Sequence, residues 1–119
     1  MPRSLPVLTD TSPICRVPLG NEGTLTDADA VALAVRLKAL GDPVRLRLLD
    51  FMLEQPDHEA CTCVLAPHVG LSDPTVSHHL KTLEAAGLVT KERRGMSVHY
   101  RVVPEAIHAV ADALHAACC

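Results

Sequence analysis

A short turn between two helix boundaries constrains this fold most. Gly70 ends a short apolar segment over residues 60–69. Ser72-Asp73-Pro74 then supplies an N-cap and an early proline for another helix, which runs to Ala86 and stops at Gly87. Pro67 predicts that the shorter helix begins near residue 64 or 65, because proline is tolerated only in the first turn. Two helices joined in this way predict a helix-turn-helix.

The flanking sequence predicts three more helices. The first begins at Thr26 or Asp27 and ends at Gly41. It is apolar almost all round, so we expect a core or a partner chain to bury it on more than one side. The second begins at Asp42-Pro43, runs to about Gln55 and turns three leucines inward: Leu46, Leu49 and Leu53. The last starts at Pro104 and runs to about residue 117.

Two strand-like stretches follow the helix-turn-helix directly. They cover residues 88–93 and 97–103 and are joined at Arg94-Gly95-Met96, so they predict a hairpin that forms a wing. The fold class is therefore mainly α with a β-hairpin, a winged helix-turn-helix over residues 24–117. Residues 1–23 hold four of the nine prolines and predict a flexible N-terminal arm, and residues 118–119 form a terminal cysteine pair.

The longer helix of the pair has a face suited to reading DNA. Val76, Leu80 and Leu83 form its buried stripe. The other side carries small or polar side chains suited to a major groove: Thr75, Ser77, His78 and Lys81. His79 falls beside the buried stripe, where we expect a packed histidine bonded to the backbone. Periodicity alone equally fits a solvated helix surface.

Charge distribution favours DNA contact. The whole chain has net charge −3, yet residues 75–103 carry five basic and two acidic side chains, a net +3. Basic residues on the wing are placed for phosphate contacts, namely Lys91, Arg93 and Arg94. Aromatic residues are 2% of the chain, which argues against single-strand and RNA binders that stack bases on aromatic rings. The expected partner is double-stranded DNA.

Three segments resemble the ArsR/SmtB family of metal-sensing repressors. They are residues 37–49, 71–89 and 93–101, and the resemblance extends over about residues 30–115. It implies a homodimer that pairs through its first and last helices, binds an operator without metal and leaves it when metal or metalloid binds. Asp73 departs from the family pattern, which usually has an uncharged polar residue there. We expect this carboxylate to cap the helix rather than to read a base.

Cysteine placement indicates the inducer. Cys61-Thr62-Cys63 resembles the thiolate motif of arsenic-, cadmium- and lead-sensing members. Residues two apart do not share a helix face, so the sulfurs converge only if Cys61 lies in the cap or the turn distorts. As(III) and Sb(III) prefer three sulfurs, and Cys15 on the arm is the candidate third ligand. Cadmium and lead sensors typically supply two arm cysteines, so As(III) or Sb(III) ranks above Cd(II) or Pb(II).

Other interpretations of the thiols stay open. Cys15 fits an incidental thiol, and Cys61 with Cys63 fits two core residues or a redox-sensing disulfide pair. A Cd(II), Pb(II) or Zn(II) sensor fits the same scaffold. Cys118 and Cys119 fit either a second arsenical site or a frayed terminus. One stripe of the last helix lacks the family's zinc spacing and is read as a polar face: His108, Asp112, His115 and Cys119.

An enzyme is not expected. Cys61-Thr62-Cys63 is not a Cys-x-x-Cys motif, and no βαβ pattern or phosphate-binding loop surrounds it, which argues against a thiol oxidoreductase or an arsenate reductase. The sequence shows neither a signal peptide nor a membrane-length apolar run, so we expect a cytoplasmic protein without a membrane partner. A reducing cytosol in turn favours metal or redox roles for five cysteines over a disulfide framework.

Overall fold

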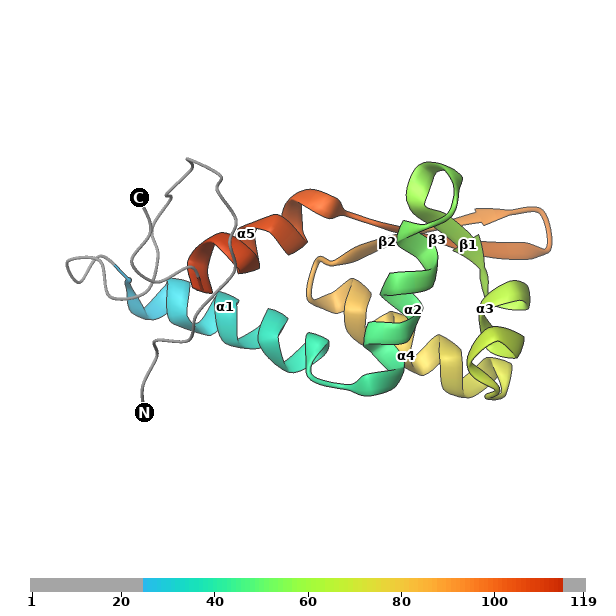
Figure 1. Ribbon diagram of the computed structural model, residues 1–119, viewed down its shortest axis with the longest axis horizontal. Coiled ribbons are helices and arrows are strands. Elements are labelled where there is room, and N and C mark those ends of the chain that lie inside the picture. Colours follow the sequence, from blue (N-terminus) through green and yellow to red (C-terminus); the bar gives the residue numbers. More distant parts are fainter. Residues whose placement is uncertain (1–24, 115–119) are drawn as a thin grey trace.

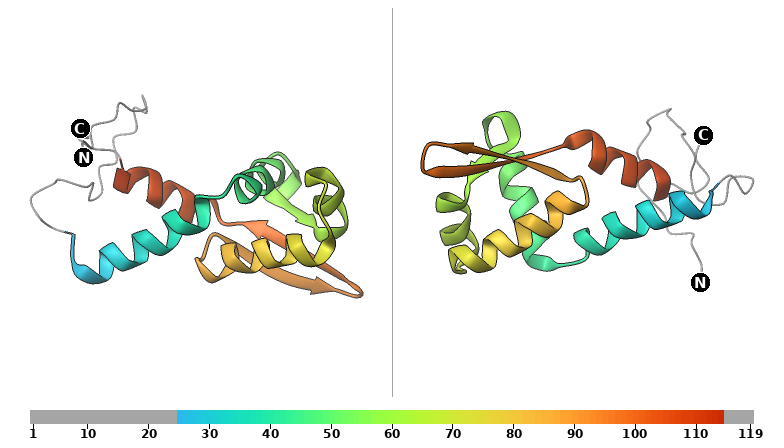
Figure 2. Two further views of the ribbon diagram at one scale, coloured as in Figure 1. Left: turned by 90° about the horizontal axis from the view of Figure 1, so that it is seen from below. Right: turned by 180° about the vertical axis from the view of Figure 1, so that it is seen from behind.

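The fold is a winged helix-turn-helix with two further helices at one end (Figure 1). A computed structural model describes residues 25–114. Helices α1 and α5 lie side by side at one end, and the other helices pack with the sheet at the other end (Figure 2). The elements in order are α1 (Asp27–Leu40), α2 (Pro43–Leu53), the 3-10 turn η1 (Pro56–His58), β1 (Glu59–Cys61), α3 (Thr62–Val69), α4 (Asp73–Ala85), β2 (Val89–Arg94), β3 (Ser97–Val102) and α5 (Pro104–Leu114).

Side-chain caps begin the helices where the sequence predicts them. Thr26 caps α1 in a capping box with Asp29, and the Asp42 carboxylate accepts the Val44 and Arg45 amides at α2. At α4 the Ser72 hydroxyl accepts the Thr75 amide. The expectation that Asp73 caps this helix is wrong. Asp73 is the first residue of α4, where its charge complements the positive end of the helix dipole.

The segment before the turn differs from the prediction. Helix α3 begins at Thr62 rather than near residue 64 or 65, because Cys61 serves as its N-cap. Pro67 therefore lies inside the helix, beyond its first turn. Gly70 ends α3 with a φ of 72°, a left-handed conformation that glycine adopts without strain. The strand β1 just before α3 was not expected from the sequence.

The three strands of the described residues form an antiparallel sheet in the order β1-β3-β2. The β2 and β3 strands form the predicted wing, with Gly95 at a φ of 63° in the two-residue turn. The β1 strand pairs with the other edge of β3, where Glu59 lies opposite Arg101 and Cys61 opposite His99. The wing is therefore hydrogen-bonded to the segment that leads directly into α3.

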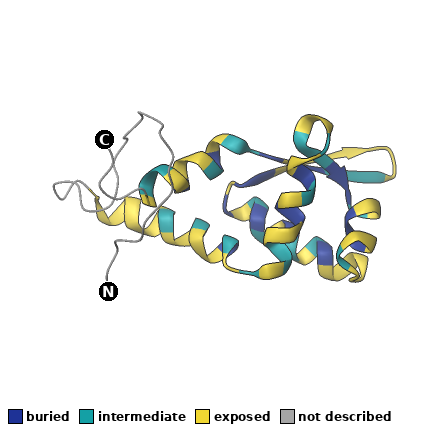
Figure 3. Ribbon diagram, in the orientation of Figure 1, coloured by how far each residue is buried: buried dark blue, intermediate teal, exposed yellow. Residues whose placement is uncertain are grey.

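The core holds α4 by the predicted stripe. Val76, Leu80 and Leu83 are fully buried. They belong to one apolar cluster with Leu48, Met52, Leu65, Leu88 and Tyr100. Figure 3 shows buried residues in dark blue along the ribbon of α4. On α2 the prediction is correct for Leu49 but wrong for Leu46 and Leu53, which are 51% and 37% exposed. The buried face of α2 is formed by Leu48, Leu49 and Met52, and it lies beside the face that carries Leu46 and Leu53. Leucine spacing alone therefore could not identify the face that packs into the core.

Helix α1 has apolar side chains on its surface. Ala39 is its one buried residue, whereas Val31 and Val35 are 64% and 45% exposed. Within the described residues 25–114 these valines are left exposed, and the sequence predicts that a core or a partner chain buries this helix. Among the helices within residues 25–114, none combines the length and the apolar character needed to cross a membrane.

Shortening Leu80 should weaken the fold strongly, because its side chain is fully buried between α4 and the rest of the core. We expect Leu80→Ala to lower the free energy of unfolding by about 2–5 kcal/mol. Urea denaturation at one fixed protein concentration measures this. Leu46→Ala is the matched control, with an expected loss below about 1 kcal/mol. Equal losses for the two variants would contradict the assigned α2 and α4 faces.

Candidate nucleic-acid interface and thiol site

The outer face of α4 presents the side chains that the sequence assigned to base reading. Thr75, His78 and Lys81 are exposed and Ser77 is half-buried. The Thr75 hydroxyl accepts a hydrogen bond from the Ser72 hydroxyl at 3.0 Å. The face is free because the opposite stripe of the helix packs into the core. Small and polar side chains on such a helix can approach base edges in a major groove.

His79 is half-buried, but its partner is not the expected backbone group. Its Nδ1 atom lies 3.3 Å from Nη1 of Arg45 on α2. A guanidinium only donates hydrogen bonds, so this contact requires Nδ1 to be an acceptor. Arg45 also donates to the backbone carbonyls of Ala39 and Lys38. The contact between His79 and Arg45 thus joins α4 to the junction between α1 and α2.

The basic residues of the wing fall into two groups. Lys91 and Arg93 are exposed, and neither takes part in an ion pair within the described part of the chain. Arg94 instead binds Glu59 with both ends of its guanidinium, Nη1 to Oε2 at 2.9 Å and Nη2 to Oε1 at 3.0 Å. Nη2 of Arg94 also donates to Glu92 at 2.8 Å.

A second arginine completes this cluster. Nη2 of Arg101 lies 3.2 Å from Oε1 of Glu59. Hydrogen bonds from Arg94 hold the pKa of Glu59 and of Glu92 below the usual glutamate value, and the same contacts raise the pKa of Arg94. Sequence reasoning missed Glu59 because its role depends on the pairing of β1 with β3, and a three-residue strand carries too little periodicity to reveal that pairing.

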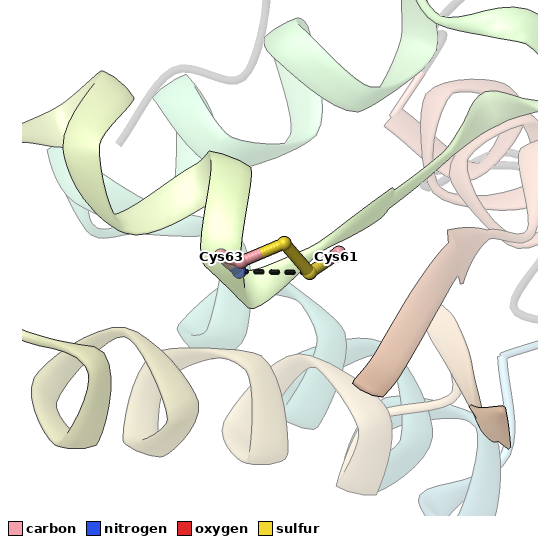
Figure 4. Close-up of a disulfide and its surroundings, with 2 residues drawn as sticks. All are labelled: Cys61 and Cys63. Atoms are coloured by element: carbon pink, nitrogen blue, oxygen red, sulfur yellow. Dashed lines mark hydrogen bonds between the residues drawn. A yellow bond between two sulfur atoms is a disulfide. The ribbon is translucent and has the colours of Figure 1, made fainter. Parts of the chain in front are cut away.

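The two cysteines before the turn converge, as the sequence allowed if Cys61 lay in a cap. Cys61 is the N-cap of α3 with extended backbone, and its Sγ accepts the Cys63 amide at 2.9 Å. A disulfide joins the two sulfurs, with the Cα atoms 5.1 Å apart (Figure 4). When the pair is reduced, the positive end of the helix favours the anionic thiolates that bind soft metals and metalloids.

The other predicted thiol ligands belong to the two terminal segments of the chain. Cys15, Cys118, Cys119 and His115 lie outside the described residues. Residues 25–114 contain no group of three or more His, Cys, Asp or Glu side chains arranged to hold a metal ion. His108 and Asp112 of the α5 stripe lie within that range. The described residues therefore bring together two sulfur donors, at the first residues of the helix-turn-helix.

A helix pair joined by a tight turn, followed by a basic hairpin, defines a winged helix-turn-helix protein. Residues 42–91 match the model for bacterial regulatory proteins of the arsR family. The ArsR2 protein of Halobacterium salinarum is 37% identical over 92 residues, which cover 76% of this chain and 73% of that protein. The chain belongs to the arsR family, whose members named here are regulators and not enzymes.

Two further similarities concern named repressors. An arsenical resistance operon repressor of Staphylococcus xylosus is 40% identical over 70 residues, which cover 59% of this chain and 64% of that protein. The crystal structure of the AntR antimony-specific transcriptional repressor superposes with a TM-score of 0.64 and 30% identity, covering 78% of this chain and 83% of that one. The chain spans 56–64% of the length of some curated relatives.

Reduced Cys61 and Cys63 should bind a trivalent arsenical as a pair, because their sulfurs converge. We expect the Cys15→Ser, Cys118→Ser, Cys119→Ser variant to take up one phenylarsine oxide per chain, since that reagent bridges two thiols. Native mass spectrometry counts the adducts. The same variant with Cys63→Ser is the control and should show weak or no uptake. Equal uptake by both would contradict pairing of the two sulfurs.

Proposed function

We propose that this protein is a metalloid-responsive transcriptional repressor. As a dimer it binds operator DNA without metalloid and releases it when As(III) or Sb(III) binds the cysteine thiolates. One observation carries the proposal: two cysteine sulfurs converge where β1 ends and the first helix of the helix-turn-helix begins. Similarity to arsenical and antimony repressors supports the choice of ligand.

The DNA contacts divide by role. The exposed face of α4 enters the major groove, where Thr75, Ser77, His78 and Lys81 meet base edges. Lys91, Arg93 and Arg94 of the wing bind phosphates, which position the protein without reading sequence. The α4 face and the wing together carry positive charge and small polar side chains rather than exposed Phe, Tyr or Trp rings. This composition agrees with binding to a DNA duplex rather than to a single strand.

Dimerisation follows from the surface of α1. Exposed Val31 and Val35 need a partner, and α5 lies beside α1 with Leu114 45% exposed. A second copy that pairs through these helices would bury this apolar surface and place two α4 helices on one duplex. We therefore expect an operator with two-fold symmetry, whose half-sites are about one helical turn apart.

Inducer binding requires the reduced pair. Three thiols displace three hydroxyl groups of arsenous acid as water and leave arsenic bound to three sulfurs. Cys61 and Cys63 supply two of these, and we assign the third to Cys15. To release DNA, the metalloid must bind the DNA-free form more tightly, with a coupling free energy on the order of 1–3 kcal/mol. Cd(II), Pb(II) or Zn(II) on the same thiols is the alternative on this scaffold.

A second candidate function is thiol redox sensing, and the Cys61–Cys63 disulfide favours it. A peroxide would oxidise the two thiols to this disulfide and be reduced to water. Release from DNA by peroxide, without any response to As(III), Sb(III), Cd(II) or Zn(II), would support this function over metalloid sensing.

Loss of a wing lysine should weaken DNA binding equally for all sequences. Log Kd against log salt has a slope set by phosphate contacts, about 0.9 for each one. Lys91→Ala removes one contact from each half of the dimer, so we expect the slope to fall by about 2. Fluorescence anisotropy with a duplex selected from a random library by the reduced protein measures this. Arg47→Ala is the charge-matched control, because this exposed cation of α2 lies outside the helices assigned to the dimer and outside the surfaces assigned to DNA. Equal slope changes would contradict the assigned interface.

Metalloid release depends on the cysteine pair. We expect As(III) to raise the Kd for the selected duplex at least fivefold in the reduced protein. Cys63→Ser should abolish this effect and leave DNA affinity without As(III) unchanged. Cys15→Ser should weaken it, and Cys118→Ser with Cys119→Ser is the control that should respond as wild type. If Cys63→Ser still releases DNA with As(III), the site is misplaced; if no duplex is selected at moderate salt, the protein is not a DNA-binding repressor.

A further inference from the structure

We propose that Glu59 couples the thiol site to the wing, because it competes with a DNA phosphate for Arg94. This inference rests on the proposed function and assigns the coupling to one side chain. Glu59 is a positioning residue in this account, since it touches neither DNA nor the inducer. The ion cluster of Glu59, Arg94, Glu92 and Arg101 is the feature that carries the inference.

The Arg94 guanidinium cannot bind Glu59 and a phosphate through the same pair of N–H groups at the same time. A guanidinium binds a carboxylate or a phosphate through a planar fork of two parallel N–H groups. In the structure both ends of the Arg94 guanidinium donate to Glu59, and one also donates to Glu92. Arg94 is the last residue of β2, beside the turn of the wing, and its side chain is 41% exposed. It is thus within the wing surface assigned to DNA but is engaged by two carboxylates.

The cluster also removes charge from the wing. Two arginines face two glutamates, so the four side chains together carry no net charge. The positive charge that the wing itself offers to DNA while Arg94 binds Glu59 comes from Lys91 and Arg93. When Arg94 turns to a phosphate, Glu59 keeps Arg101 as a partner. The exchange therefore moves one cation to the DNA without leaving Glu59 unpaired.

Glu59 is linked to the thiols through the backbone. It lies two residues before Cys61 in the three-residue strand β1, so both side chains are on the same face of the sheet. Ala60 between them points to the other face and pairs with Tyr100, and both Ala60 and Cys61 are buried. A shift of Cys61 as its sulfur joins the inducer is transmitted along this short strand to Glu59, and hence to Arg94.

Glu92 provides a matched comparison. It binds the same arginine and has the same charge, but it lies two residues before Arg94 on β2 and moves with it. Replacing Glu92 therefore alters the charge around Arg94 without altering the connection from β1 to the wing. Glu59 is the acidic residue of the cluster that comes from β1.

The experiment compares operator affinity with and without As(III) for the reduced full-length chain and its variants. We expect Glu59→Gln to tighten binding of the metalloid-free protein about two- to fivefold, the range of an exposed ion pair. If the inducer acts by holding Arg94 on Glu59 more firmly, the Kd of the inducer-bound form should fall by a larger factor than this. The ratio of Kd with As(III) to Kd without it should therefore decrease. Glu92→Gln should keep the wild-type ratio. In an Arg94→Ala background, Glu59→Gln should change neither quantity, because the competing cation is absent.

Several results would overturn the inference. The first is an unchanged ratio of Kd with As(III) to Kd without it in Glu59→Gln. The second is weaker DNA binding by that variant. The third is that Glu59→Gln tightens DNA binding equally with and without Arg94, which would indicate a general charge effect. Phenylarsine oxide uptake and urea unfolding of each variant show that the thiols and the fold are intact. If wild type binds no duplex or ignores As(III), the proposed function fails and this inference with it. If wild type does both and Glu59→Gln behaves like it, this inference alone fails.

Discussion

The position of Cys61 is the constraint on which the rest of the structure depends. This residue is the last of β1 and the N-cap of α3, and its sulfur accepts an amide of that helix. Its backbone pairs with β3 of the wing at His99. One residue therefore joins a thiol pair, the first helix of the helix-turn-helix and the hairpin. We propose that a ligand that moves this sulfur acts on both the helix-turn-helix and the wing through short covalent and hydrogen-bonded connections.

Packing and charge divide the DNA-binding end between stability and function. The stripe of Val76, Leu80 and Leu83 holds α4 in the core, and the polar face that we propose for the major groove lies on the other side of the helix. Thr75, His78 and Lys81 on that face are exposed, so we expect them to tolerate substitution without unfolding of the domain. The net charge of −3 for the whole chain gives no indication of the net +3 over residues 75–103, which contain most of α4 and the wing. The ion cluster around Glu59 neutralises Arg94 in this form, and we propose that Arg94 exchanges Glu59 for a DNA phosphate.

Local signals in the sequence predicted most of the fold. Caps at Thr26 and Asp42 and the buried stripe of α4 depend on neighbours within one or two turns, so they could be recognised directly. The cap of α4 was expected at Asp73 and lies one residue earlier, at Ser72. The features that were missed depend on distant partners: the strand β1, its register with β3, and the Glu59–Arg94 pair. The sequence predicted that the sulfurs of Cys61 and Cys63 converge only if Cys61 lies in the helix cap or if the turn distorts. The assignment of Cys15 stays a prediction.

The central claim is that the inducer acts through the junction at Cys61. Hydrogen–deuterium exchange of the reduced protein with and without As(III) tests it most directly, because it reports each segment separately. We expect altered amide exchange at the start of the helix-turn-helix, over residues 59–65, together with altered exchange in β3 over residues 97–102. Changes confined to α1 and α5, with these two segments unaffected, would contradict it.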